Sequence, residues 1–281
     1  MSQSHLDSVR SMYDERSEDY DENEVHIKQA RDYCEWAGLR RGESLLDLAC
    51  GTGLVALEAK RRVTGSGHVV GVDISEGMLT VARRKAAAAG LDDVRFFNHD
   101  IISDLAAIRD DILPDGAEGF DVITCASALV LLPDPLRAVR NWQALLRPRG
   151  GRLVTDVQTK DANLVMNVFS DIASRVGESV PWNSELLRSR RELERLAVHA
   201  GLDVQTVFET DAYAKTRYHV DDARQIFDQA VGKAMFSNFG RADIRDQARD
   251  LFVQRFTDMA GSAGSIEEET RFWVLVATRS A

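Results

Sequence analysis

The sequence predicts an α/β fold in which helices wind over both faces of a largely parallel sheet. Helix-like segments alternate with short apolar runs that are typical of buried strands. These runs cover residues 45–48, 68–74, 94–98, 120–125 and 152–157. With 281 residues, 44% of them hydrophobic, the chain can bury one large core or one core with an appendage. We therefore expect a doubly wound α/β domain.

The most informative stretch is the run LLDLACGTG at residues 45–53. It indicates a buried strand that carries Asp47 and opens onto a loop with Gly51 and Gly53. Glycine tolerates positive φ and lets the backbone approach a ligand, and the next helix directs its N-terminal amides into the loop. Such a turn binds a nucleotide cofactor at the carboxyl edge of a sheet. The glycines alone also fit the dinucleotide pattern G-x-G-x-x-A, which ends here at Ala56.

Asp47 helps to separate these cofactors. A carboxylate repels a pyrophosphate, whereas it attracts an ammonium group. S-adenosylmethionine carries an amino-acid tail and a sulfonium and no phosphate, so Asp47 favours it over NAD. The run resembles the first motif of the class I S-adenosylmethionine-dependent methyltransferases. This resemblance implies S-adenosyl-L-methionine as cofactor and S-adenosyl-L-homocysteine as product.

Later segments extend the resemblance in the expected order. Asp73 ends the second strand 20 residues after Gly53, the spacing that places a carboxylate on ribose hydroxyls. The third strand leads to Asp100, the fourth to Cys125, and a proline–glycine turn precedes the fifth. The family then implies a Rossmann-like seven-stranded sheet whose last strand is antiparallel. The cofactor-binding residues expected from these matches are Asp47, Ala49, Gly51, Gly53, Asp73, Ile74, Met78, Asp100, Ile101 and Cys125. For Met78, packing between helix and sheet is the alternative.

A tyrosine- and acid-rich segment at 12–21 precedes this core. It resembles the lid segment of ubiquinone-type and many small-molecule methyltransferases. A tyrosine face near a sulfonium gives a cation–π contact of about 0.5–2 kcal/mol. Tyr20 is the first candidate for this catalytic contact, and Tyr13 is the second, as a substrate-binding residue. The alternative is an acidic amphipathic helix that only covers the sheet.

The second half of the chain is longer than a minimal fold requires. Aromatic residues in a helical insertion could form an apolar pocket for a small acceptor, or they could pack the insertion against the core. His219 is a candidate base. The expected substrate-binding residues, besides Tyr13, are Ala126, Leu129, Trp182, Tyr218 and Phe227.

The predicted organisation follows from these segments. It comprises an N-terminal helical lid (1–38), a cofactor-binding core (39–160), a cap helix with the sixth helix and strand of the core (161–211), a helical cap insertion (212–264) and the last core strand (265–281).

The composition limits which classes of partner and which cellular compartment we expect. A net charge of −10, with 45 acidic against 35 basic residues, disfavours a phosphate backbone, so we expect no nucleic acid. No apolar run reaches the ~20 residues of a membrane span. Cys34, Cys50 and Cys125 are isolated, which predicts no metal site and reduced thiols in the cytoplasm. The oligomeric state stays open.

The stretches at 12–17, 46–55 and 72–79 look like fungal methyltransferases of secondary metabolism, including the gliotoxin-type thiomethyltransferases. No base stands out in a motif, which favours an acceptor that ionises readily, such as a thiol with a pKa near ~8.5. We expect methyl transfer to a heteroatom of a small molecule, sulfur first and then oxygen or nitrogen. The alternatives are a ubiquinone-type C-methyltransferase, a member that binds the cofactor without transferring methyl, and, least favoured, a nicotinamide oxidoreductase.

Overall fold

The computed structural model describes residues 3–102, 105–113, 116–180, 182 and 189–280. A seven-stranded sheet with the order β3-β2-β1-β4-β5-β9-β6 forms its centre. The first five strands of the chain are parallel, and β9 lies antiparallel between β5 and β6, which confirms the expected fold class. The strands are β1 Leu45–Leu48, β2 Val69–Asp73, β3 Arg95–Asn98, β4 Val122–Cys125, β5 Arg152–Gln158, β6 Leu202–Glu209 and β9 Phe272–Arg279.

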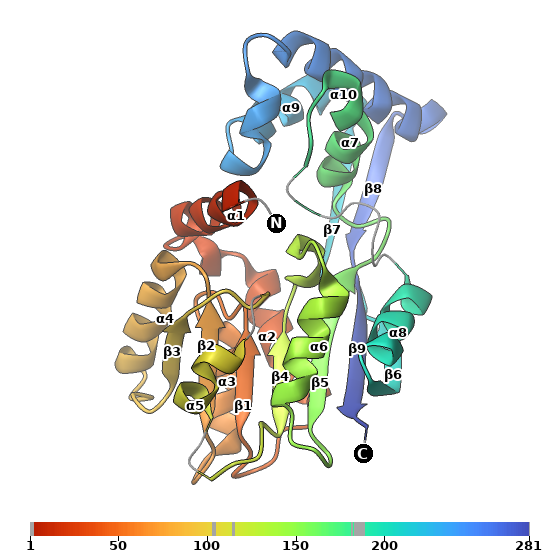
Figure 1. The fold of residues 1–281 in the computed structure, drawn as a ribbon. Coiled ribbons are helices and arrows are strands. Elements are labelled where there is room, and N and C mark those ends of the chain that lie inside the picture. The colour runs from red at the N-terminus through yellow and green to blue at the C-terminus, as the bar shows by residue number, and fades with distance from the viewer. Residues whose placement is uncertain (1–2, 103–104, 114–115, 181, 183–188, 281) are drawn as a thin grey trace.

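Helices cover both faces of this sheet (Figure 1). Side chains alternate between the faces, so Leu45 packs with one cluster of buried residues and Leu46 with the other. Both are fully buried, because a strand in the middle of a parallel sheet is covered on both sides. One face carries α2 Glu24–Trp36, α3 Leu54–Val63 and α4 Glu76–Ala88, and the other carries α5 Arg109–Ile112, α6 Pro135–Leu145 and α8 Arg190–His199.

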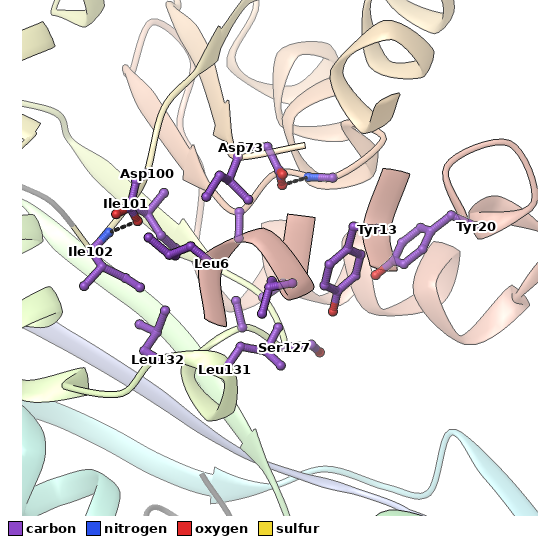
Figure 2. Close-up of a pocket in the computed structure, with 16 residues that line it drawn as sticks. Leu6, Tyr13, Tyr20, Asp73, Asp100, Ile101, Ile102, Ser127, Leu131 and Leu132 are labelled. Carbon is purple, nitrogen blue, oxygen red and sulfur yellow. Dashed lines mark hydrogen bonds between the residues drawn. The ribbon is translucent and has the colours of Figure 1, made fainter. Parts of the chain in front are cut away.

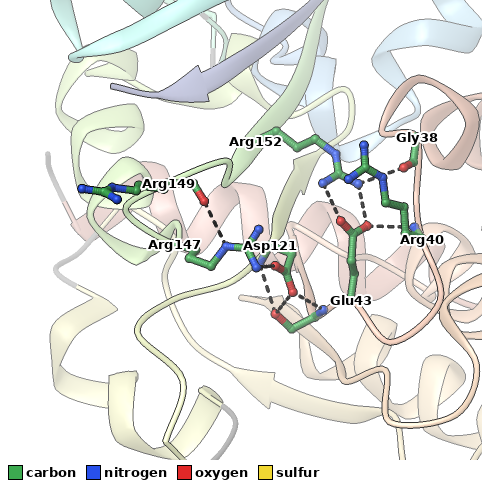
Figure 3. Close-up of polar contacts among 8 residues, drawn as sticks. Gly38, Arg40, Glu43, Asp121, Arg147, Arg149 and Arg152 are labelled. Carbon is green, nitrogen blue, oxygen red and sulfur yellow. Dashed lines mark hydrogen bonds and ion pairs between the residues drawn. The ribbon is translucent and has the colours of Figure 1, made fainter. Parts of the chain in front are cut away.

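Ion pairs tie together the amino ends of the central strands (Figure 3). Arg152, at the start of β5, forms a bidentate pair with Glu43 at N···O distances of 2.9 and 2.6 Å. Asp121, just before β4, accepts a hydrogen bond from the Ser44 amide at 2.8 Å and pairs with Arg147. These contacts link the segments at the amino edge of the sheet to one another. The opposite, carboxyl edge is therefore the one that can hold a binding site.

A helical cap with a hydrophobic core of its own stands beyond that carboxyl edge (Figure 1). Phe169 lies at its centre, with ring-centroid distances of 4.6 Å to Phe236 and 5.7 Å to Phe227. The cap consists of α7 Leu164–Ala173, α9 Ala223–Val231, the 3₁₀ segment η6 Ala234–Gly240 and α10 Arg245–Ala260.

The cap connects to the core through a second, two-stranded sheet of β7 Ala214–His219 and β8 Ser265–Thr270. This corrects two expectations, because the insertion is not wholly helical and residues 265–270 do not belong to the core sheet. Both strands are polar and pair through cross-strand charges, such as Arg217 with Glu267 and Lys215 with Glu269. Such strands give no apolar run in the sequence.

The expected lid at 1–38 also divides in two. The helix α1 Gln3–Arg16 and the 3₁₀ turn η1 Tyr20–Glu22 precede α2, and Figure 1 shows α1 between the core and the cap. In contrast, α2 is part of the core, since Tyr33 and Cys34 are fully or almost fully buried against the sheet. Within the described residues, no helix is both long and apolar enough to span a bilayer.

Candidate active site

Two adjoining cavities open at the carboxyl edge of the sheet. The larger has a volume of about 710 Å³ and lies beneath α1, and the smaller, about 430 Å³, lies over the loop after β1. Their shared lining residues are Tyr20, Ala49, Gly51, Ala126 and Ser127. Figure 2 shows Tyr13 and Tyr20 on one side of the larger cavity and Asp100 to Ile102 on the other.

The loop after β1 takes the shape that its glycines predict. Gly51 and Gly53 have φ values of 54° and 77°, which disfavour residues with a side chain. A Cβ on Gly53 would lie 3.1 Å from the Phe96 ring, so glycine also lets α3 start close against β3. The loop backbone therefore lines both cavities with little side-chain bulk.

Asp47 lines the smaller cavity and is only 1% exposed. Its Oδ1 accepts a hydrogen bond from Thr124 at 2.8 Å, whereas its Oδ2 has no partner within the described part of the chain. Burial raises the pKa of this carboxyl to about 7. A buried carboxylate oxygen without a donor fits a cationic group, and the ammonium of S-adenosylmethionine supplies one.

Asp73 ends β2 in the larger cavity. Its two oxygens accept hydrogen bonds from the amides of Gly51 and Ser75, each at 2.8 Å (Figure 2 shows the first). Burial raises its pKa, and these amides act in the opposite direction. The amides orient the carboxylate, and its remaining lone pairs can accept from ribose hydroxyls. Asp100, on the far wall, accepts from the Ile102 amide at 2.9 Å.

Tyr13 and Tyr20 bring the N-terminal segment to the larger cavity, and Tyr20 lines both. Burial raises the pKa of both phenols, so at neutral pH they are hydrogen-bond donors rather than bases. The Tyr20 ring stacks on His26 at a centroid distance of 4.2 Å, and Arg16 lies over it at 5.7 Å. Neighbours on α1 and α2 therefore already contact the Tyr20 ring, which leaves its hydroxyl and edge for a ligand.

Carboxylates hold this segment on the core. Asp14 accepts hydrogen bonds from Ser75 Oγ at 2.6 Å and from the Gly77 amide at 2.9 Å, at the start of α4. Asp21 accepts from Thr52 Oγ1 at 2.5 Å and pairs with Lys85. Glu18 pairs with Arg84 farther along α4. These contacts place α1 over the larger cavity as its roof.

The structure brings together most of the residues expected at the cofactor, but two of them are buried elsewhere. Met78 and Cys125 are fully buried and line neither cavity, and Cys125 belongs to one of the two hydrophobic clusters that cover the sheet. Gly53 also lies outside the lining and serves the turn itself. Residues of the expected cofactor set that line a cavity are Asp47, Ala49, Gly51, Asp73, Ile74, Asp100 and Ile101.

The substrate set needs larger corrections. Tyr13 and Ala126 line the larger cavity, but Leu129 is fully buried in the core under it. Trp182 and Phe227 pack inside the cap and are part of its hydrophobic core. Tyr218 and His219 lie on β7, with Tyr218 against Phe256 and His219 exposed, and neither lines a cavity.

Several lining residues carry no signal in the sequence. Leu6 and Val9 of α1 and Leu131 and Leu132 after β4 complete the apolar wall of the larger cavity. Gln29 of α2 lines the smaller cavity, although a glutamine within a helix belongs to no sequence motif. In the described part of the chain, no cluster of three or more His, Cys, Asp or Glu residues is arranged to hold a metal ion.

Comparison with known proteins agrees with this geometry. The model of a protein family described as "Methyltransferase domain" matches residues 39–207, more than half of the chain. A demethylmenaquinone methyltransferase of Listeria monocytogenes serotype 4a (strain HCC23) is 25% identical over 216 residues, which cover 70% of this chain and 86% of that relative. The ubiquinone/menaquinone biosynthesis C-methyltransferase UbiE of Idiomarina loihiensis is 30% identical over 201 residues, covering 69% and 75%.

A solved structure extends the agreement to the fold. The YcgJ protein of Bacillus subtilis superposes with a TM-score of 0.60 at 19% identity, over 90% of this chain and 99% of that one. The matching domain includes the glycine loop, Asp47 and Asp73, so the cofactor is S-adenosylmethionine. The chain belongs to the class I S-adenosylmethionine-dependent methyltransferases.

Proposed function

We propose that this methyltransferase acts on a small, largely apolar acceptor that carries no phosphate or carboxylate. The observation that carries this proposal is the lining of the larger cavity. Apart from the two aspartates and the polar groups of Tyr13, Tyr20 and Ser127, its described lining residues are glycine, alanine, valine, leucine and isoleucine. None of these lining residues is a lysine, arginine or histidine, so a phosphate or carboxylate group on the acceptor would meet the two aspartates without a cationic side chain to bind it.

When bound, S-adenosylmethionine supplies a methyl group on a positively charged sulfur. The residues of this chain bind, orient and exclude water. Asp47 takes the ammonium of the cofactor, and Asp73 takes the ribose hydroxyls. The apolar wall formed by Leu6, Val9, Leu131 and Leu132 holds the acceptor beside Ala126, where the two cavities join. Holding both molecules in line contributes up to about 7–11 kcal/mol of the barrier reduction.

Two kinds of acceptor atom suit this cavity. The names of the relatives favour a ring carbon, because both are quinone-pathway methyltransferases and one is named a C-methyltransferase. The lining favours a heteroatom that ionises readily, thiol sulfur before oxygen or nitrogen, because Tyr13 and Tyr20 stay protonated and Asp73 already binds two amides. The gliotoxin-type resemblance belongs to this second proposal. A cytoplasmic location is proposed with both.

Mass spectrometry tests the proposal directly. The purified chain with S-adenosylmethionine is offered matched pairs of acceptors, a neutral aromatic thiol, phenol and hydroquinone, each beside its carboxylated analogue. We expect methyl products on neutral acceptors and at least about tenfold less on their carboxylated partners. Products on sulfur or on a ring carbon then decide the atom. Equal turnover of the carboxylated series would contradict the proposal, and tight cofactor binding without any product would favour a non-methylating member.

A further inference from the structure

A buried polar cluster lies directly beneath the place where the two cavities join. It consists of Asp156 at the end of β5, Tyr33 and Gln29 of α2, and Ser127 after β4. Asp156 is 1% exposed and lines neither cavity, whereas Ser127 lines both and appears in Figure 2 in the wall of the larger one. None of the cofactor-binding residues described above belongs to this cluster.

Ser127 is held in an unusual backbone conformation. Its φ is 54°, which a residue with a side chain adopts only at a cost. The Asp156 carboxylate stabilises this conformation, because the Ser127 amide donates to Asp156 Oδ1 at 2.6 Å. The strained loop thus presents the Ser127 side chain at the cavity wall.

The hydrogen bonds of the Ser127 hydroxyl leave one position open. Gln29 Nε2 donates to Ser127 Oγ at 3.0 Å, and Oγ can donate its own proton to Asp156 Oδ2 at 3.4 Å or to Gln29 Oε1 at 3.3 Å. A hydroxyl has one donor and two acceptor positions. Among the described residues no second donor reaches Oγ, so one lone pair is available to a ligand in either cavity.

Asp156 is suited to receive a proton. Burial raises its pKa to about 6, and hydrogen bonds from Tyr33 and Ser127 limit the increase. The titratable groups facing it are Tyr33, Cys125 and Tyr213, and burial raises the pKa of all three, so they are neutral at pH 7. Asp156 forms no ion pair with a lysine or arginine of the described chain. Near neutral pH Asp156 is therefore ionised and can accept one proton to become a neutral carboxylic acid.

We propose that Ser127 and Asp156 form a proton relay that removes the proton of a hydroxyl-bearing acceptor. The acceptor O–H bond breaks, and its electron pair stays on the acceptor oxygen. The proton bonds to Ser127 Oγ while the hydroxyl proton of Ser127 passes to Asp156 Oδ2, which becomes a carboxylic acid. Ser127 is then the catalytic residue, and Asp156 is a positioning residue that also stores the proton. This inference rests on the proposed function for its acceptor class.

The relay is tested first without methyl transfer. The probe is 4-nitrophenol, bound to the complex of the protein with S-adenosylhomocysteine at a pH where both the free probe and Asp156 are anionic. Two buried negative charges would repel each other, so binding the phenolate should take up about one proton. Calorimetry in buffers of different ionisation enthalpy measures this uptake. We expect about one proton for the wild type and none for Asp156→Asn.

Turnover with S-adenosylmethionine separates the relay from a structural role. The probes are 4-nitrophenol below its pKa and 4-nitrothiophenol, which is already a thiolate there. Asp156→Asn and Ser127→Gly should lower kcat on the phenol by about 10²–10⁴-fold and on the thiol by less than about threefold, with KM little changed. Ser127→Gly removes the hydroxyl but tolerates the positive φ, so it keeps the loop if Asp156→Asn does not fold. Asp121→Asn, a carboxylate at the opposite edge of the sheet (Figure 3), is the matched control.

The outcomes are distinct. Proton uptake in the wild type alone supports the relay even if neither probe is methylated, in which case only the proposed acceptor class is wrong. No uptake, equal uptake by Asp156→Asn and the wild type, or no binding of the probe overturns the relay. Equal losses on phenol and thiol also overturn it, since a purely structural role predicts them.

Discussion

The carboxyl edge of the sheet and the helical cap both contain side chains that are typical of ligand sites. Carboxylates lie at the sheet edge and aromatic rings lie in the cap, and the two groups differ in what they contact. At the sheet edge, Asp47 and Asp73 are buried with oxygen atoms available to a ligand. In the cap, Phe169 and Phe227 face other aromatic rings, and both are fully buried. A buried carboxylate needs a partner, whereas a buried phenylalanine is satisfied by its neighbours. The edge is therefore organised for binding and the interior of the cap for folding.

The largest effect that would test this contrast is expected from Phe227→Ala. Phe227 contacts Phe169 and Phe252 in the cap core, and removing a fully buried phenylalanine costs about 3–5 kcal/mol of unfolding free energy. Because the cap core lines neither cavity, affinity for S-adenosylhomocysteine should change less than about twofold in the folded protein. Denaturant unfolding and calorimetry measure the two quantities. Val198→Ala, at an exposed side chain of α8, is the control for stability. A large loss of affinity without a loss of stability would mean that Phe227 reaches the ligand.

Asp73→Ala should show the reverse pattern. The substitution removes the proposed ribose contact and leaves the amides of Gly51 and Ser75 without their acceptor. We expect at least about 100-fold weaker binding of S-adenosylhomocysteine, equivalent to ~2.7 kcal/mol. Asp203→Ala, at an exposed position of β6, should leave binding unchanged. If affinity survives in Asp73→Ala, the ribose is held elsewhere.

These two substitutions also mark what the sequence could and could not predict. Asp73 is predictable because it combines a strand end with a fixed spacing from Gly53, and both are local properties. Phe227 is not, because a helix with an apolar face looks the same whether that face meets a ligand or another helix. The polar strand β8 is not predictable either, because cross-strand charges rather than an apolar run stabilise its pairing. Ser127 and Asp156 lie 29 residues apart and meet only through the pairing of β4 with β5.

A smaller effect, dependent on pH, should come from Asp47. Its pKa of about 7 in the free protein means that an ammonium group, which requires the carboxylate, meets a mostly protonated acid at pH 6. Affinity for S-adenosylhomocysteine should therefore fall up to about tenfold per pH unit below 7. Asp47→Asn should bind more weakly at pH 8 and lose this dependence on pH. Affinity of the wild type that is flat between pH 6 and 8 would place the ammonium away from Asp47.

The stability of the free protein gives an independent measure of the same group. The folded pKa lies above the unfolded value, so the folded state binds more protons between about pH 4 and 7. The contribution of Asp47 to stability must then fall as pH rises through this window and stay constant above it. Asp47→Asn removes the contribution, so the variant should be more stable than the wild type at pH 8 but not at pH 4. Thermal unfolding across this range distinguishes the two proteins.

The smallest effects are expected where α1 meets the core. The contacts there differ in burial, so the variants should differ in the size of their effect. Asp14 accepts two hydrogen bonds at the start of α4, so Asp14→Ala should loosen the roof and speed the release of S-adenosylhomocysteine by about five- to tenfold. Glu18 meets Arg84 in solvent, where an ion pair contributes little, so Glu18→Gln should change the release rate less than about twofold. Stopped-flow displacement at low and high salt measures both rates.

Salt should abolish the small effect of Glu18→Gln and leave most of the effect of Asp14→Ala, because screening acts on exposed ion pairs more than on partly buried hydrogen bonds. If both variants release the ligand at the wild-type rate, α1 does not control access, and ligands enter from the side of the cap.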